Sequence, residues 1–215
     1  MKDSTKKTLE VLFERYPALE ACRADICEAA ETICAAYHAG GKLLLCGNGG
    51  SAADAEHIVG ELMKGFLKKR PLTREICERL RELFPQDADY MSENLQGALP
   101  AVSLVNSVAL GTAFANDQAA DLVFAQQVLG LGREGDVLLA ISTSGNSKNV
   151  LYAVEIARVR GLKTIALTGR SGGKLKPLAD STIAAPEDET YRIQELHLPV
   201  YHAICIAAEE EFFEA

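Results

Sequence analysis

The sequence predicts a single α/β domain in which helices flank a parallel sheet of five strands. Short, continuous apolar runs, which suit strands buried on both faces, alternate with longer segments of helical periodicity. This alternation is typical of a parallel sheet covered by helices. The chain has 215 residues, of which 48% are hydrophobic, and this is sufficient for one domain with a sizeable core.

An N-terminal helical arm, residues 1–40, precedes the first predicted strand. Apolar residues in this arm recur at steps of three and four, the spacing of an amphipathic helix: Leu19, Cys22, Ile26, Ala29, Ile33 and Ala36. Pro17 is expected to start this helix after a shorter first one. Such an arm serves either oligomerisation or the covering of a sheet face.

Strand and helix patterns then alternate along the rest of the chain. The strands are expected at residues 42–46, 101–105, 136–141, 164–167 and 181–185. The helices are expected at residues 51–66, 107–115, 122–130, 147–160 and 192–213. The charged segment 72–98 interrupts this alternation, and its apolar residues Ile76, Leu80, Leu83 and Phe84 share one helical face. We interpret the segment as an inserted helix and loop that covers a site, extends a subunit contact or only decorates the surface.

Composition excludes several classes of protein. The formal net charge of −8 argues against a nucleic-acid-binding surface as the main function, and we interpret the basic group Lys64, Lys68, Lys69 and Arg70 as a solvated helix end. No apolar run approaches the roughly 20 residues of a membrane span. The six cysteines form neither a Cys-x-x-Cys pair nor a zinc-finger pattern, so we expect reduced, mostly buried thiols in a cytoplasmic protein.

Two polar turns follow predicted strands, at the edge where open α/β sheets bind ligands. In the first, residues 47–51 read Gly-Asn-Gly-Gly-Ser, which matches neither a dinucleotide fingerprint nor a Walker loop. In the second, residues 142–147 read Ser-Thr-Ser-Gly-Asn-Ser, with four hydroxyls in six positions. One helix N-cap needs only one hydroxyl. The second turn therefore suggests a phosphate site built from neutral donors and the helix dipole.

The chain resembles the sugar isomerase (SIS) domain family, and within it the phosphoheptose isomerases. The motifs that carry the resemblance are "LLLCGNGGSAADAEH", "GDVLLAISTSGNSKNV" and "TIALTG". The resemblance covers about residues 5–70 and 100–213 and leaves out the segment 72–98, where the family has a short loop. It implies a five-stranded parallel sheet, a homotetramer and heptose biosynthesis through the interconversion of sedoheptulose 7-phosphate and D-glycero-D-manno-heptose 7-phosphate.

The resemblance also implies a set of site residues. The phosphate is expected on Ser51, Ser142, Thr143, Ser144 and Ser147, and the sugar along Asn48, Gly49, Gly50, Asp117 and Gln194. One Zn²⁺ per subunit is expected on His57, Glu61, Gln194 and His202, whose nitrogen and oxygen donors suit this metal.

The spacing of these metal positions is compatible with the resemblance but does not require it. His57 and Glu61 lie four residues apart, on one helical face, and an arbitrary pair of this kind is a polar, partly exposed surface. Gln194 and His202 lie eight apart, and their directions differ by about 80° on a helix. Pro199 between them kinks that helix or moves its start to about residue 198. His197 is either a structural histidine or a subunit contact.

Ketose–aldose isomerisation moves a proton between adjacent carbons through an enediol. In this reaction Glu61 is the candidate base, His202 the candidate acid, and the metal a Lewis acid for the enediolate. Two other functions compete: a non-catalytic sugar-phosphate sensor, and an adaptor that binds a replication initiator. A sensor needs the serines without a base and an acid, and an adaptor needs neither, so the four metal positions favour the enzyme.

Overall fold

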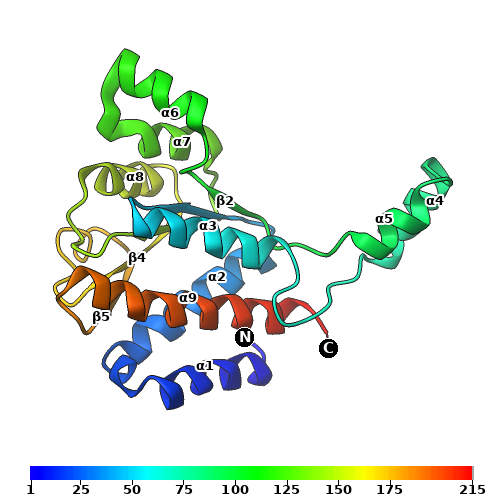
Figure 1. Ribbon diagram of the computed structural model, residues 1–215, viewed down its shortest axis with the longest axis horizontal. Helices are drawn as coiled ribbons and strands as arrows, with labels where there is room; N and C mark the ends of the chain where they lie inside the picture. Colours follow the sequence, from blue (N-terminus) through cyan, green and yellow to red (C-terminus); the bar gives the residue numbers. More distant parts are fainter. Residues whose placement is uncertain (215) are drawn as a thin grey trace.

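Five parallel strands form one sheet in a computed structural model that describes residues 1–214 (Figure 1). Their spatial order is β2-β1-β3-β4-β5. In chain order they are β1 (Leu43–Cys46), β2 (Ala101–Ser103), β3 (Val137–Ile141), β4 (Lys163–Gly169) and β5 (Ser181–Ala185). The predicted sheet is confirmed. Ala215, the last residue of the predicted domain, lies outside the described residues.

Helices precede, connect and follow the strands. They are α1 (Asp3–Arg15), α2 (Arg23–His38), α3 (Gly50–Met63), α4 (Arg74–Leu83), α5 (Ala88–Asn94), α6 (Val108–Phe114), α7 (Val123–Leu131), α8 (Lys148–Val159) and α9 (Thr190–Phe212). Short helical turns occupy η1 (Pro17–Cys22), η2 (Ala115–Ala119) and η3 (Ala120–Leu122). Pro17 starts the short turn η1, whereas the amphipathic helix that it was expected to start, α2, begins six residues later at Arg23. The helices expected at residues 51–66, 107–115, 122–130, 147–160 and 192–213 are present within three residues of their predicted bounds.

The sheet separates two apolar cores, because successive side chains of a strand point to opposite faces. Leu43 and Leu45 of β1 join a core with buried residues of α1, α2, α3 and α9. Leu44 and Cys46 join a second core with α7 and α8. Within the N-terminal arm, α2 packs against β5 and β3 while α1 packs along α9. Covering a sheet face is therefore one role of this arm, and oligomerisation stays a prediction.

The long helix α9 is continuous through Pro199. The alternative that this helix begins near residue 198 is wrong, and Gln194 and His202 lie on the same helix. Proline removes one backbone hydrogen bond from a helix interior, but α9 is flanked by α1, α2 and α3, which pack along it (Figure 1). No helix in residues 1–214, α9 included, has the length and apolar character that a membrane crossing requires.

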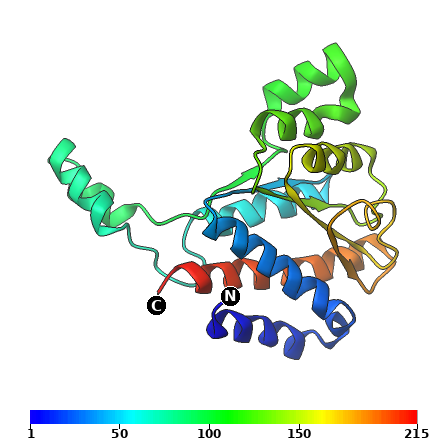
Figure 2. The same cartoon turned by 180° about the vertical axis from the view of Figure 1, so that it is seen from behind.

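The segment 72–98 forms two helices, α4 and α5, where one helix and a loop were expected. Figures 1 and 2 show this pair reaching away from the body of the molecule. No residue of α4 is buried. We call residues 72–98 the projecting arm.

Of the basic group at the root of the projecting arm, Lys64 and Lys69 are exposed as the sequence suggested, but Arg70 is not solvated. The Arg70 side chain is fully buried, and its Nε lies 2.8 Å from Glu209 Oε1. Its Nη1 and Nη2 donate to the carbonyls of Leu62 and Glu61, at 2.6 and 3.0 Å. The carboxylate of Glu209 also accepts from the backbone N–H of Phe66 at 2.8 Å. The carbonyls of Glu61 and Leu62 and the N–H of Phe66 thus bond to Arg70 and Glu209 instead of to one another along a helix. This explains why α3 ends at Met63, three residues before its predicted end.

A buried carboxylate near the end of α9 joins the two termini of the described chain. Glu211 accepts hydrogen bonds from Thr5 Oγ1 and the Lys2 backbone N–H, both at 2.7 Å, and its Oε1 lies 3.0 Å from His38 Nε2. Burial raises the pKa of Glu211, but these three contacts outweigh burial and bring the pKa to about 2.

Acid should therefore weaken the fold partly through Glu211. A folded-state pKa below the ordinary 4.5 contributes stability above that pH, and the contribution is lost as the pH falls toward about 2. We expect the free energy of unfolding, measured by urea denaturation, to fall less between pH 5 and pH 2 in Glu211→Gln than in the unmodified protein. Glu14→Gln, which changes an exposed carboxylate of α1, is the control. Equal pH dependence in the unmodified protein and Glu211→Gln would contradict this prediction.

Candidate active site

The two polar turns meet at the carboxyl ends of neighbouring strands. Strands β1 and β3 pair in parallel, with Cys46 opposite Ala140, so the turns that follow them lie side by side. The side-chain amides of Asn48 and Asn149 exchange two hydrogen bonds, of 2.9 and 2.8 Å, and tie the first turn to the start of α8. The sequence prediction missed Asn149, because no local pattern distinguishes an asparagine that bridges two turns.

The turn at residues 142–147 packs closely against a neighbouring loop and is lined with hydroxyls. Ser142 Oγ and Ser147 Oγ lie 3.0 Å apart, and α8 begins at the next residue. Gly145 has a φ of +63°, and a Cβ at this position would overlap the carbonyl of Gly172. The turn therefore needs glycine to pack against the loop that follows β4. Its hydroxyls and the free N–H groups of α8 suit an oxyanion.

The cation nearest in sequence to this turn is already paired. Lys148 Nζ lies 2.7 Å from Asp121 Oδ2, and this contact raises the pKa of Lys148. The observation agrees with the expectation that neutral groups and the dipole of α8 would hold a phosphate.

A groove of about 330 Å³ adjoins the first turn. Gly47, Asn48 and Gly49 form one wall, and residues that follow β2 form the other. Ser51 is buried beside these glycines, in the first turn of α3. Asp117 lies elsewhere, in a separate groove with Phe114 and Gln118, where η2 directly continues α6. The chain thus brings Asn48, Gly49 and Ser51 together, and the predicted sugar contact of Asp117 stays a prediction.

Three of the four predicted metal positions gather where α3 and α9 pack together. His57 Nε2 lies 3.1 Å from Glu61 Oε1, and the His57 and His202 rings meet edge to face with their centroids 5.0 Å apart. The Glu61 side chain is 13% exposed, so it is shielded from water but still reachable. Lys64 Nζ lies 3.2 Å from its other oxygen.

Gln194 lies apart from this cluster. Its side-chain amide sits against Gly50, where a Cβ would overlap it. Eight residues of helix separate Gln194 from His202, a rise of about 12 Å. Gln194 therefore faces the glycine turn. Within residues 1–214, no group of three or more His, Cys, Asp or Glu side chains lies close enough together to hold a metal ion without rearrangement.

Tyr201 and Asp54, which sequence reasoning missed, orient His57. Tyr201 donates from its hydroxyl to Asp54 Oδ1 at 3.2 Å, and His57 Nδ1 lies 3.1 Å from the same hydroxyl. Because the phenol hydrogen is used on Asp54, His57 Nδ1 must donate to Tyr201. Asp54, three residues before His57 on α3, could have been found from helical spacing; nothing in the sequence marked Tyr201, which is 2% exposed.

This network bears on whether the cluster fits a metal. With Nδ1 donating to Tyr201, His57 Nε2 faces a Glu61 carboxylate oxygen at 3.1 Å, and either a proton on Nε2 or a metal ion bound by both groups would satisfy this contact. His202 Nε2 is buried and has no hydrogen-bond partner within residues 1–214, and burial, followed by the charge of His57, lowers the pKa of His202. Two imidazole nitrogens and a carboxylate, with a second hydrogen-bonding shell behind one imidazole, are a donor set that fits Zn²⁺.

His197 has a structural role. It is fully buried, its Nε2 donates to the carbonyl of Thr168 on β4 at 3.1 Å, and burial lowers its pKa to about 4. Of the two alternatives that the sequence left open, the structural histidine is confirmed, because a fully buried ring has no surface to offer a neighbouring subunit.

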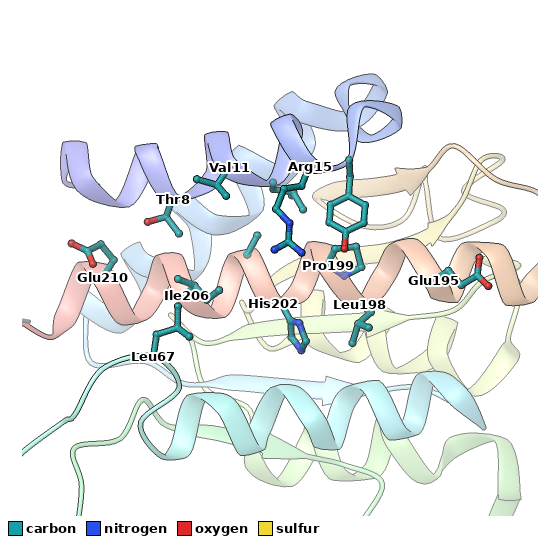
Figure 3. Close-up of a pocket in the computed structure, with 13 residues that line it drawn as sticks. Thr8, Val11, Arg15, Leu67, Glu195, Leu198, Pro199, His202, Ile206 and Glu210 are labelled. Carbon is teal, nitrogen blue, oxygen red and sulfur yellow. The ribbon is translucent and has the colours of Figure 1, made fainter.

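His202 also borders a second groove. This groove has a volume of about 540 Å³ and runs between α1 and α9, with His202 on the α9 wall (Figure 3). We call it the α1–α9 groove.

Comparison with known proteins agrees with this architecture. The SIS domain family model matches residues 12–98 and 81–169, two stretches that overlap within the projecting arm. A phosphoheptose isomerase of Akkermansia muciniphila is 35% identical over 213 residues, which are 99% of each chain, and that of a Nitratiruptor species is 44% identical over 80% of this chain and 78% of its own. The solved phosphoheptose isomerase of Francisella tularensis is 32% identical, with a TM-score of 0.75 over 98% of this chain and 100% of its own.

Proposed function

The chain belongs to the phosphoheptose isomerase family of SIS-domain proteins, and we propose that it isomerises sedoheptulose 7-phosphate to D-glycero-D-manno-heptose 7-phosphate. The observation that carries this proposal is the cluster of His57, Glu61 and His202 on the helix pair that begins beside the two polar turns. A sensor or an adaptor would have no need of a carboxylate and two imidazoles at this place.

The residues divide into a phosphate end and a reactive end. The hydroxyls of residues 142–147 and the N-terminus of α8 would hold the phosphate, and Ser51 would add a further hydroxyl. Asn48 and Gly49, on the adjoining groove, would face the sugar. The amide of Gln194, packed on Gly50, lies at this same end of α3 and is placed to donate to a sugar hydroxyl.

Proton transfer falls to Glu61 and His202. Glu61 takes the carbon-bound proton next to the carbonyl, because it is the carboxylate of the cluster and is largely shielded from water. His202 exchanges a proton with the substrate oxygen, since its Nε2 has no hydrogen-bond partner in the described part of the chain. Return of the proton to the neighbouring carbon completes the isomerisation.

Zn²⁺ is part of this proposal. His57, Glu61 and His202 would hold it, with Gln194 as the fourth ligand. When bound, the ion supplies Lewis-acid stabilisation of negative charge on the substrate oxygens. The hydrogen bond of His57 to Tyr201 keeps Nε2 free for that role.

The proposal also covers assembly and location. The family supports a homotetramer. The six cysteines, which are all free and four of which are buried, support a location in the cytoplasm. Sedimentation of a stable monomer at micromolar concentration would contradict the oligomer.

Deuterium exchange tests the reaction itself. Incubation with a panel of ketose phosphates in deuterated water should place deuterium at the carbon next to the carbonyl of sedoheptulose 7-phosphate. No incorporation with any ketose phosphate, from protein loaded with Zn²⁺, would refute the isomerase.

Loss of one hydroxyl at residues 142–147 should weaken substrate binding. Ser144→Ala or Ser147→Ala is expected to cost roughly 1.5–3 kcal/mol, the value of a hydrogen bond to a charged group. Michaelis constants measured with sedoheptulose 7-phosphate should rise accordingly. Ser181→Ala, at the amino end of β5 and thus at the opposite edge of the sheet, is the control. Unchanged constants in both test variants would place the phosphate elsewhere.

A further inference from the structure

The helix α4 presents an apolar strip that its own chain leaves uncovered. The strip consists of Ile76, Leu80, Leu83 and Phe84, spaced at i, i+4, i+7 and i+8. Ile76, Leu83 and Phe84 are 47%, 51% and 55% exposed. Within residues 1–214, α5 is the only element that α4 packs against closely. Helices of 10 and 7 residues are too short to be stable by themselves in water, so the arm needs a partner.

Hydrogen bonds fix the root of the arm to the body of the molecule. Gly97 N–H donates to the Arg70 carbonyl and Gly65 N–H to Gln96 Oε1, both at 2.6 Å. The side chain of Arg70 anchors this root to Glu209 of α9. The arm is therefore held outward in a defined direction, as Figures 1 and 2 show.

The α1–α9 groove is complementary to the strip. Val11, Leu67 and Leu198 line it and are 50%, 68% and 41% exposed (Figure 3). On α9 its lining runs from residue 195 to residue 210, about 22 Å of helix, and the ten residues of α4 need about 15 Å. The groove is thus long enough to receive the whole of α4.

Charges flank both surfaces in a matching manner. Glu75 and Arg79 border the strip, and Arg15 and Glu195 border the groove. Docking would pair Glu75 with Arg15 and Arg79 with Glu195. Arg79 can exchange partners, because its contact to Glu82 is exposed and 3.6 Å long.

We propose that α4 of one copy of the chain docks in the α1–α9 groove of a second copy. Ile76, Leu80 and Leu83 are the anchors of this helix-in-groove contact. Leu67, at the root of the arm, also lines the groove, while the arm points away from the body. Each copy can therefore give its arm and receive that of its partner about a two-fold axis. The docked helix covers the groove that His202 borders, so exchange of arms closes one side of the cluster to water.

Complementation between variants tests this proposal. The arm variant is Ile76→Glu/Leu83→Glu, and the groove variant is Val11→Glu/Leu198→Glu; all four residues are at least 41% exposed, so the fold should survive. Sedimentation should show self-association at least tenfold weaker in each variant than in the unmodified chain. Val159→Glu, 79% exposed on α8, is the matched control and should associate normally.

An equimolar mixture of the two variants distinguishes exchange between copies from docking of the arm within one chain. The mixture retains one intact arm and one intact groove, so it should associate more tightly than either variant alone. If the mixture is no tighter than its components, the arm docks on its own chain or on another protein, and the proposal fails. Unmodified self-association in both variants would overturn it equally. Circular dichroism of each variant verifies that it is folded.

Discussion

Glu61→Gln is expected to lower turnover of sedoheptulose 7-phosphate by roughly a hundredfold to ten-thousandfold, the range typical of general-base loss. The substitution keeps the size of the side chain and one hydrogen-bonding oxygen but removes the basic carboxylate. Affinity for the sugar phosphate should change far less, because the hydroxyls of residues 142–147 remain. Steady-state kinetics with Zn²⁺ present separate turnover from the Michaelis constant. Glu56→Gln, an exposed position on the same helix, is the control and should be unaffected.

Metal content decides what kind of role Glu61 has. If Glu61 acts chiefly as base, the variant should retain bound zinc. If it acts chiefly as ligand, zinc measured by atomic emission should fall with activity, and added zinc should restore part of it. Turnover close to that of the unmodified enzyme would remove Glu61 from the mechanism and favour the sensor.

Most of the fold was predictable because burial imposes local patterns. Strands such as β3, with all five residues buried, must be continuous apolar runs, and those runs are visible in the sequence. Two features depend on contacts across the chain and were missed or misread. Arg70, the last residue of the basic group, was expected to be solvated, because its partner Glu209 lies 139 residues away. The alternative start of α9 near Pro199 arose from local backbone chemistry, which the packing of α9 between other helices overrides.

The site was predictable where its residues share an element or a turn. His57 and Glu61 lie on one helical face, and the serine-rich turn is a single stretch, so both appear in the sequence. Asn149 and Tyr201 act through partners on other elements, and no spacing reveals them. The direction in which Gln194 turns is likewise set by its contact with Gly50 across the helix interface.

The buried pair Arg70–Glu209 should be among the most sensitive places in the chain. Arg70 donates three hydrogen bonds, to Glu209 and to the carbonyls of Glu61 and Leu62. Its guanidinium also lies 4.7 Å from the Phe213 ring centroid. The orphan carbonyls at the end of a helix need partners, and here a buried cation provides them at the turn of α3 that carries Glu61. The pair therefore links stability to the position of the candidate base.

Arg70→Met is expected to lower the free energy of unfolding by about 3–5 kcal/mol, because it leaves the Glu209 carboxylate buried without its cation. Arg70→Lys should cost less, since a point charge remains, but it cannot reach both carbonyls and the carboxylate together. Urea denaturation measures both variants, and Lys69→Met, an exposed neighbour, is the control.

In Arg70→Met/Glu209→Gln no charge is left uncompensated, so the free energy of unfolding of this double variant should fall by less than the sum of the losses in its single variants. Additive losses would show that the two side chains act independently. A loss in Arg70→Met no larger than in Lys69→Met would show that the pair does not hold the end of α3. If the pair does position Glu61, Arg70→Lys should reduce kcat more than it changes KM even at temperatures where it is fully folded, whereas a purely structural role would leave both constants unchanged.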